Sequence, residues 1–318
     1  MTQYFSLKYK ILKRTAKLTG SRKKLSGSAE ELIEKYRKKP KVLNIPQKAN
    51  SPFLTFEIKN ENLYVFSYLR HKSRLCKVLM YIPGGGMLQY PVVSDYKLFE
   101  ELTLETNRDV VIPYYPLCID GTIDVSLDMI YWLYKRLISE YGEGNVAVAG
   151  CSSGGNLALG LISHINAKGE NLPMPEKLYV SSPVMCIYTQ EERERAEQLD
   201  KTDIAVPVKW LDTEYDIITH GKELPPYMAY PQLGIYDGLK EAYISFADNE
   251  VLYAMCDSLV SRMEAAGVDV QLEIGWGLYH CYPVKNVVRD AFWGHVNMLK
   301  YLKADILSSL SINNSKSQ

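Results

Sequence analysis

Residues 146–154 read Val-Ala-Val-Ala-Gly-Cys-Ser-Ser-Gly, and this stretch decides the fold. The apolar run Val146–Ala149 predicts a buried strand, and Asn156–Ile165 predicts a helix. Between them, Gly150-Cys151-Ser152-Ser153-Gly154 fits the pattern G-x-S-x-G, in which a strained strand-to-helix turn exposes a serine oxygen above a sheet. Glycines on both sides of the serine let the strand and the helix approach closely. We therefore predict that Ser152 is a nucleophile; the alternative is an ordinary turn with the same letters.

Short apolar strands alternate with helices on both sides of this turn. A hairpin over 54–58 and 62–69 precedes them. Continuous apolar strands between helices indicate a mostly parallel sheet covered on both faces, so the predicted fold class is α/β. The later strands are predicted at 77–82, 109–113, 146–150, 177–181, 242–247 and 268–274, and the helices at 94–107, 125–141, 154–167, 251–266 and 285–307. The polar tail 308–318 is expected to fray.

Two regions fall outside this alternation. Residues 187–235 contain a charge run and then Pro225, Pro226 and Pro231, which indicates an inserted helical excursion. In the basic arm 1–50, apolar residues at helical spacing over 4–18 predict one helix, and Ser28 with Glu31 has the spacing of a capping box at the start of another. The first helix is interpreted as a solvated surface helix. A helix on an anionic membrane surface and a lid over a pocket are the alternatives.

The net charge is unevenly distributed along the chain. With 37 Lys/Arg and 37 Asp/Glu, the formal net charge is zero. Residues 1–50 hold 14 Lys/Arg and 3 Asp/Glu, a net charge of +11, and the other 268 residues carry −11. This distribution does not give the domain-wide positive field of a nucleic-acid-binding protein, so we expect no nucleic-acid partner. A hydrophobic fraction of 47% fits an ordinary folded protein.

The sequence predicts a reduced, cytoplasmic protein. None of its six cysteines forms a Cys-x-x-Cys pair or stands at zinc spacing from a histidine, so we expect neither a metal site nor a disulfide scaffold. The basic N-terminus has no uninterrupted apolar segment, which argues against a secretory signal. No stretch approaches the ~20 apolar residues of a membrane span, so we expect no stable membrane insertion. The cysteines are Cys76, Cys118, Cys151, Cys186, Cys256 and Cys281.

A glycine-rich turn, Pro83-Gly84-Gly85-Gly86, follows the predicted strand 77–82. Three consecutive glycines lose much conformational entropy on folding, so they suit a loop whose bare N–H groups face a ligand. An acyl-transfer serine needs such donors for the developing oxyanion. The N–H of Ser153, at the helix start, would supply a further donor. The alternative is an ordinary flexible turn.

Among five histidines, His280 is the best placed to act as a base. It follows the predicted strand 268–274 and a glycine-containing turn, and reactive residues gather in loops at the carboxyl ends of such strands. The alternative is an exposed loop histidine. The acid comes before the histidine in this arrangement, and both Asp248 and Glu250, after the strand 242–247, are placed to reach it. One carboxylate would fix the imidazole tautomer. The other would stabilise the N-terminus of the following helix through its negative charge.

Together these segments resemble the hormone-sensitive-lipase-like branch of the α/β-hydrolases, which includes bacterial acetyl-esterases. The resemblance covers residues 54–305. It implies an α/β-hydrolase fold with a helical cap. The segments that carry it are Pro83–Gly86, Gly150–Gly155 with Asn156-Leu157-Ala158, Glu250-Val251-Leu252, Gly277-Leu278-Tyr279-His280, Lys177–Pro183 and Tyr115–Asp128.

The resemblance also implies roles for single residues. Ser152 would be the nucleophile and His280 the general base. The acid of this branch directly precedes a Val/Ile-Leu pair, which selects Glu250 and leaves Asp248 as the alternative acid. The N–H groups of Gly85, Gly86 and Ser153 would form the oxyanion hole.

For the organisation of the chain, the resemblance implies a cap and a core. The arm 1–50 and the insertion at 187–235 would form the cap. Residues 51–318 would form the hydrolase domain that contains this insertion.

The sequence departs from the family pattern at two places. Pro83 stands where the family has the His of H-G-G-G, which is thought to shape the loop rather than transfer a proton. Cys151 and Ser153 replace the Asp and Ala of G-D-S-A-G. We expect these changes to affect rate and substrate range rather than reaction type. Cys151 is interpreted as a buried inert thiol, with an oxidation-sensitive thiol as the alternative.

The predicted function is hydrolysis of small, short-acyl esters such as acetyl esters, through an acyl-enzyme and without a metal or organic cofactor. A homodimer is compatible with the sequence. The alternatives are an amidase or carbohydrate deacetylase with the same triad, a non-catalytic ligand-binding relative, and a lipase that uses the basic arm at a membrane interface.

Overall fold

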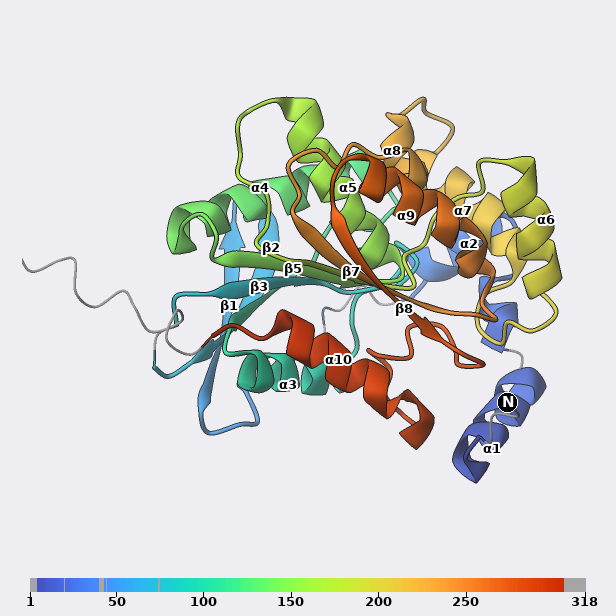
Figure 1. Cartoon of the computed structure of the whole chain (residues 1–318), viewed down its shortest axis with the longest axis horizontal. Helices are drawn as coiled ribbons and strands as arrows, with labels where there is room; N and C mark the ends of the chain where they lie inside the picture. Colours follow the sequence, from blue (N-terminus) through green and yellow to red (C-terminus); the bar gives the residue numbers. More distant parts are fainter. Residues whose placement is uncertain (1–4, 20, 40–42, 44, 74, 306–318) are drawn as a thin grey trace, which may run out of the picture.

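A twisted eight-stranded sheet runs through the centre of the molecule in the computed structural model, which describes residues 5–19, 21–39, 43, 45–73 and 75–305 (Figure 1). The strand order is β1-β2-β4-β3-β5-β6-β7-β8. Strand β2 pairs antiparallel with β1 and β4, and all other neighbours are parallel. The predicted α/β class and α/β-hydrolase fold are confirmed. The strands are Leu54–Glu61, Tyr64–His71, Val78–Ile82, Asp109–Pro113, Val146–Cys151, Leu178–Ser181, Glu241–Ala247 and Asp269–Gly275, from β1 to β8.

Helices cover both faces of this sheet. Helices α3 (Tyr96–Thr106) and α10 (Phe292–Leu302) lie on one face, and α4 (Ile123–Tyr141), α5 (Ser153–Lys168) and α9 (Cys256–Ala265) lie on the other (Figure 1). Strand β3 is buried at every residue because its alternate side chains enter the two cores in turn. This two-sided burial is why the central strands are continuous apolar runs in the sequence.

The insertion and the N-terminal arm lie against each other. The insertion folds into α6 (Gln190–Leu199), α7 (Val208–Thr219) and α8 (Pro226–Ala229), and the arm into α1 (Leu7–Thr19), η1 (Ser21–Leu25) and α2 (Ala29–Arg37). Helix α2 packs on α7 and begins with the predicted capping box. The guanidinium of Arg22 forms an ion pair with Asp200, and Thr213 Oγ1 donates to the carbonyl of Gly27 at 3.3 Å. The remaining 3-10 turns are Val93–Asp95, Pro231–Leu233, Val251–Met255 and Arg289–Ala291.

The last predicted helix, 285–307, is wrong at both ends. Helix α10 begins only at Phe292, after a series of turns and a 3-10 turn. The extended backbone of Val288, with a φ of −134° and a ψ of 150°, interrupts any helix that would begin at residue 285. At the other end Lys303 is extended, so the helix stops at Leu302. The predicted fraying of 308–318 falls outside the described residues.

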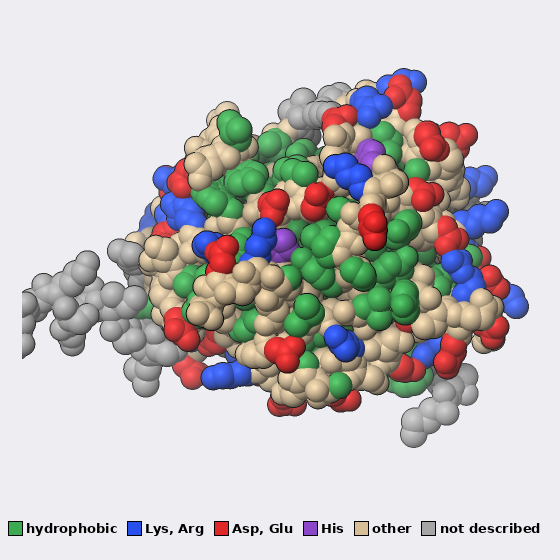
Figure 2. Space-filling model, turned by 90° about the horizontal axis from the view of Figure 1, so that it is seen from above, with side chains coloured by type: hydrophobic (Ala, Val, Ile, Leu, Met, Phe, Trp, Pro, Cys, Tyr) green, Lys and Arg blue, Asp and Glu red, His purple; other side chains and the backbone are tan. Residues whose placement is uncertain are grey.

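Charged side chains of both signs share the surface. On the face seen in Figure 2, described Lys and Arg side chains are interspersed with Asp and Glu side chains. Charged side chains also form local pairs, as Arg136 does with Glu61 at 2.7 Å and with Glu140 at 2.5 Å. Neighbouring charges on the body of the protein therefore compensate each other over short distances.

Candidate active site

Ser152 occupies a strained turn between β5 and α5. Its φ of 53° and ψ of −127° lie outside the regions that non-glycine residues favour. The turn is tight because the flanking glycines touch backbone: a Cβ on Gly150 would lie 2.2 Å from the carbonyl oxygen of Gly154, and one on Gly154 would lie 2.1 Å from that of Ile82. The strand–turn–helix context predicted for this motif is therefore present.

Ser152, His280 and Glu250 form one hydrogen-bonded series, although the first and the last of them in sequence, Ser152 and His280, are 128 positions apart. The Oγ of Ser152 lies 3.0 Å from Nε2 of His280, and Nδ1 of His280 lies 2.8 Å from Oε2 of Glu250. Since Glu250 is an acceptor, His280 donates from Nδ1 and keeps Nε2 free to accept the serine proton. Glu250 is 1% exposed and His280 6%, so both lie away from bulk water. The arrangement is able to activate a serine hydroxyl; the catalytic roles of the three residues stay predictions.

Asp248, the alternative acid, lies elsewhere. Its Oδ1 accepts a hydrogen bond from the backbone N–H of Gly277 in the loop that precedes His280. The structure thus brings Glu250, and not Asp248, to the imidazole. Asp248 instead holds the turn between β8 and His280.

Ser182 was not predicted, and it connects the acid to the loop of the base. Its Oγ donates to Oε1 of Glu250 at 2.7 Å and accepts from the N–H of Cys281 at 2.9 Å. The N–H of Ala247 donates to the same Oε1 at 2.9 Å. Ser182 follows β6 with a φ of 44°, and the only sequence signal for it is its place in the segment Lys177–Pro183.

The glycine turn after β3 packs directly on the nucleophile turn. A Cβ on Gly84 would lie 2.8 Å from the carbonyl oxygen of Cys151 and 3.0 Å from Cβ of Ser152. Gly86 has a φ of 62°, and its Cα faces the indole of Trp210. The turn is anchored where Tyr115 OH donates to the carbonyl of Pro83 at 2.8 Å. The loop therefore lies beside Ser152, while the oxyanion-hole roles of Gly85, Gly86 and the Ser153 amide stay predictions.

The N-terminal helix contacts the loop that carries His280. Tyr9 OH donates to the carbonyl of Gly277, and the rings of Tyr9 and Tyr279 lie 5.7 Å apart. The backbone N–H of Ser6 donates to Asp290 Oδ1 at 2.9 Å. These contacts place the arm at the edge of the candidate site.

A cavity of about 450 Å³ lies between the arm and the insertion, close to the acid. Basic side chains line it, among them Arg22, Lys23 and Lys201. Asp203, also in its lining, is 5% exposed and accepts from the N–H of Val251, the residue after Glu250, at 2.9 Å. Burial raises the pKa of Asp203.

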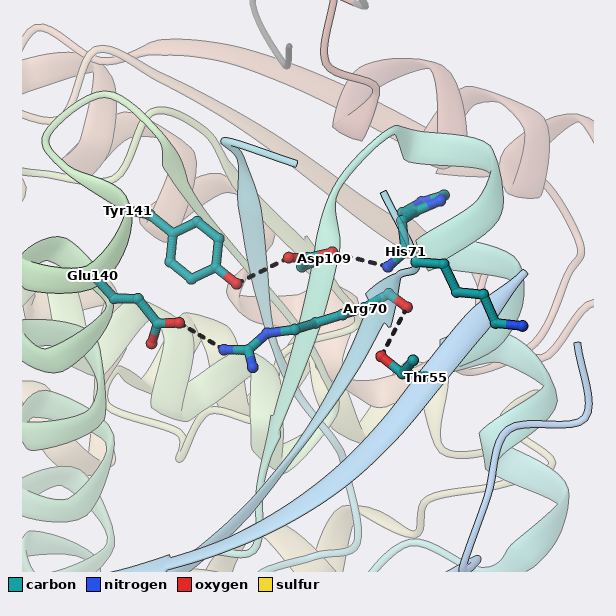
Figure 3. Close-up of a pocket in the computed structure, with 7 residues that line it drawn as sticks. Thr55, Arg70, His71, Asp109, Glu140 and Tyr141 are labelled. Atoms are coloured by element: carbon teal, nitrogen blue, oxygen red, sulfur yellow. Dashed lines mark hydrogen bonds and ion pairs between the residues drawn. The ribbon is translucent and has the colours of Figure 1, made fainter. Parts of the chain in front are cut away.

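A second cavity, of about 400 Å³, lies at the opposite edge of the sheet (Figure 3). Asp109, the first residue of β4, lies at its base and accepts from the N–H of His71 at 3.1 Å and from Tyr141 OH at 3.0 Å. Arg70 there pairs with Glu140 at 2.6 Å. Burial raises the pKa of Asp109 to about 6. Asp109 lies at the amino end of β4, whereas Ser152 follows the carboxyl end of β5. Because β4, β3 and β5 are parallel, this cavity is far from the hydrogen-bonded series.

Two further observations concern the described ranges as a whole. Within them, no three His, Cys, Asp or Glu side chains are grouped so that they could hold a metal ion. No helix in these ranges combines the length and apolar character needed to cross a bilayer.

Comparison with known proteins gives a consistent picture. The sequence profile of a family described as alpha/beta hydrolase fold matches residues 79–284. Esterase LipU of Mycobacterium tuberculosis is 26% identical over 215 residues, which cover 65% of this chain and 71% of that protein. The structure of an esterase from the bacterial hormone-sensitive lipase family has a TM-score of 0.76 at 18% identity and covers 95% of this chain and 99% of that chain. A hormone-sensitive lipase from a metagenome library has a TM-score of 0.69 at 19% identity, with coverages of 86% and 88%.

Proposed function

The chain belongs to the alpha/beta hydrolase fold family and is a carboxylesterase-like enzyme, and we propose that it hydrolyses small esters through Ser152, His280 and Glu250. The family predicted from the sequence is thereby confirmed. One observation carries the proposal: a serine at a strained turn, an imidazole and a buried carboxylate are hydrogen-bonded in series. This is the arrangement that nucleophilic catalysis at neutral pH requires.

The proposed reaction has two halves. Ser152 Oγ attacks the ester carbonyl while His280 Nε2 takes its proton, and Glu250 stabilises the resulting imidazolium. His280 then protonates the departing alcohol, which leaves an acyl-enzyme. A water molecule that gives its proton to His280 hydrolyses this intermediate and restores Ser152.

The oxyanion of each tetrahedral intermediate would be held by backbone N–H groups of Gly85, Gly86 and Ser153. The contact of Gly84 with Ser152 supports this assignment, because it keeps the glycine turn against the reacting serine. Donors fixed before the reaction stabilise the charge without reorganising. Pro83 does not prevent this role, because its carbonyl is anchored by Tyr115.

We propose that the arm over 1–50 and the insertion near 187–235 form a cap over the hydrolase domain 51–318. The pairing of Arg22 with Asp200 and the packing of α2 on α7 support this grouping. The cavity between them is lined by Arg22, Lys23 and Lys201, so positive charge would tune substrate access beside Glu250.

For the substrate, we propose a short acyl chain such as acetyl. The indole of Trp210 supports this choice, because its Cζ2 would lie 3.0 Å from a Cβ on Gly86 and so forms a rigid wall beside the proposed oxyanion hole. Trp210 is 2% exposed and held in the core. A long acyl chain would have to displace this ring.

A series of p-nitrophenyl esters from acetate to laurate tests the substrate proposal. We expect kcat/KM to be highest for the shortest chains, and we expect Trp210→Leu to move the optimum toward longer ones. A preference of the unmodified protein for long chains would overturn the short-acyl proposal. The matched control is Trp276→Leu, which changes an indole that is 61% exposed on the loop after β8.

Two alternatives within the same site are separated by simple assays. Activity on N-acetyl or O-acetyl sugars that exceeds activity on simple esters would indicate an amidase or carbohydrate deacetylase. A fluorophosphonate that fails to label Ser152 in the folded protein would indicate a non-catalytic relative.

A membrane-interface lipase is a second candidate because of the outer side of α1. Leu7 and Ile11, one helical turn apart, are 74% and 54% exposed, and the exposed Lys10 and Arg14 flank them. An apolar strip between cations suits an anionic lipid surface. Co-sedimentation with phosphatidylserine vesicles at low and high salt tests it. Binding at low salt that Leu7→Ser/Ile11→Ser removes would support docking, and no binding at low salt would exclude it.

A further inference from the structure

Two cysteines flank the proposed reacting residues in sequence and meet in space. Cys151 directly precedes Ser152, and Cys281 directly follows His280. Cys151 pairs with Ser181 across β5 and β6, and Cys281 Sγ lies 3.6 Å from the carbonyl oxygen of Ser181. Both cysteines therefore neighbour Ser181, and both lie in the core between the sheet and α3.

The two thiols have different surroundings. Cys151 Sγ accepts a hydrogen bond from Tyr81 OH, whose oxygen lies 3.4 Å away. Cys281 Sγ instead lies 3.6 Å from the carbonyl oxygen of Ser181 and 3.4 Å from Nε2 of His280. The neighbouring Cys281 side chain, and after it Tyr81, lower the pKa of the Cys151 thiol, whereas burial raises the pKa of the Cys281 thiol. Cys151 therefore has more of the thiolate character that attacks an oxidant.

The exposed fractions of the two thiols also indicate that Cys151 reacts first. Cys151 is 6% exposed, whereas Cys281 is fully buried. Only a small oxidant would reach Cys151, and Cys281 would react with whatever formed there. This is the usual pairing of an attacking thiol with a resolving thiol.

We propose that Cys151 and Cys281 are an oxidation site at which hydrogen peroxide forms a disulfide that reversibly stops ester hydrolysis. Cys151 thiolate attacks one peroxide oxygen, the O–O bond breaks, and hydroxide leaves, so that Cys151 becomes a sulfenic acid. Cys281 sulfur then attacks Cys151 sulfur, the S–O bond breaks, and hydroxide leaves. With both thiol protons counted, two thiols and one peroxide give one disulfide and two waters.

The disulfide would act on catalysis through position. Sulfur atoms in a disulfide are about 2.05 Å apart, closer than two non-bonded sulfur atoms can approach, so Cys151 and Cys281 must move toward each other. Ser152 and His280 are bonded to them and would move too. A displacement near 1 Å costs about 100-fold in rate when reacting groups are prealigned. Closing this bond also removes the Cys281 sulfur from its place 3.4 Å from Nε2 of His280.

The effect on rate rests on the proposed function, but formation of the bond does not. The first test is therefore peptide mapping of the intact protein by mass spectrometry after treatment with hydrogen peroxide, without reduction. We expect a peptide linked through Cys151 and Cys281 that dithiothreitol separates. Absence of this linkage after treatment with both peroxide and diamide would overturn the inference, whether or not the protein hydrolyses esters.

The second test follows p-nitrophenyl acetate hydrolysis before peroxide, after it and after dithiothreitol. We expect a loss of 10-fold or more that dithiothreitol restores. We expect Cys281→Ala to lose this reversible component, because its Cys151 sulfenic acid has no resolving thiol and is oxidised by a second peroxide to sulfinic acid, which dithiothreitol does not reduce. The matched control is Cys76→Ala. Cys76 is also 6% exposed but lies just before the amino end of β3, so its variant should keep the full response.

Two outcomes of the second test would contradict the proposal. One is a linked protein that hydrolyses the ester at the original rate. The other is a Cys281→Ala variant that is inactivated and restored as the unmodified protein is. A protein that forms the linkage but never hydrolyses an ester would refute the proposed function and leave the oxidation site standing.

Discussion

Ser182 donates a hydrogen bond of 2.7 Å to Glu250, the buried carboxylate that holds His280. The same hydroxyl accepts from the N–H of Cys281, the residue after the imidazole. One side chain thus fixes the acid and the loop of the base relative to each other. Because Ser182 directly follows β6, the end of β6 sets the distance between the loop of Glu250 after β7 and the loop of His280 after β8.

Replacing Ser182 with Ala should lower kcat for p-nitrophenyl acetate with little change in KM. The Cys281 N–H and one Glu250 oxygen lose a partner, and an unsatisfied buried group costs about 1–3 kcal/mol. If this cost falls on the transition state, kcat drops ~10-fold or more. Steady-state kinetics of Ser182→Ala and of the control Ser163→Ala, which changes a buried serine in the middle of α5, measure how much of the loss in kcat is specific to Ser182. Equal effects of the two variants on kcat would show that Ser182 has no positioning role.

Replacing Gly84 with Ala should inactivate the protein because the added Cβ has no room, and not because the backbone is strained. The new Cβ would lie 2.8 Å from the carbonyl oxygen of Cys151 and 3.0 Å from Cβ of Ser152, so the glycine turn must move away from the nucleophile. We expect a fall in kcat of ~100-fold, as for a 1 Å misplacement of a catalytic group. Gly121→Ala is the control, since a Cβ there meets nothing within 4 Å. A Gly84→Ala variant with normal kcat would show that the glycine turn is not part of the oxyanion hole.

Asp109 should make stability depend on pH in a direction opposite to that of most carboxylates. Burial raises its pKa from 3.8 to about 6 in the folded protein, so the folded state binds the proton more tightly than the unfolded state. Its contribution is therefore fully present below pH 4 and is lost as the pH rises through 6.

We expect Asp109→Asn to gain stability relative to the unmodified protein by about 2–3 kcal/mol between pH 4 and pH 7. Urea unfolding of both proteins at each pH measures this difference, and titrations that the two proteins share cancel in it. The absolute stability of the variant also reflects the bonds from His71 and Tyr141, so only the change with pH is diagnostic. A difference that is constant with pH would contradict the burial of a carboxyl group in this cavity.

The hydroxyl of Tyr9 should couple the arm to the base. It donates to the carbonyl of Gly277, three residues before His280, and Tyr9 is fully buried. Tyr9→Phe removes that bond and should lower the free energy of unfolding by about 1 kcal/mol. Thermal and urea unfolding measure the loss, with Leu7→Ala, on the exposed side of the same helix, as the control. If Tyr9→Phe is as stable as the control, the arm is not fixed to this loop.

Much of the sheet could be predicted from the sequence because its strands are buried on both faces. The bounds of β4 agree with prediction at Asp109 and Pro113, since every residue between them is buried. The capping box of α2 was also readable, because it depends on two residues three positions apart. Ser182 could not be read, because its partner is 68 residues away and no local pattern encodes the bond.

The choice of acid and the start of the last helix show how far local patterns reach. Asp248 and Glu250 stand two residues apart after one strand, so their spacing leaves both open. The family resemblance selects Glu250, and the structure places Glu250 at His280 and Asp248 at Gly277. Periodicity alone extended the last helix back to residue 285. The extended backbone of Val288 delays it to Phe292.

The proposal that Ser152, His280 and Glu250 form a catalytic unit is tested most directly by kcat/KM for p-nitrophenyl acetate. The unmodified protein is compared with Ser152→Ala, His280→Ala and Ser152→Ala/His280→Ala, after circular dichroism shows that each is folded. Residues that act as one unit are not additive, so each single variant should lose about 10⁴-fold or more and the double variant little beyond that. Equal turnover by the unmodified protein and the single variants would contradict the assignment.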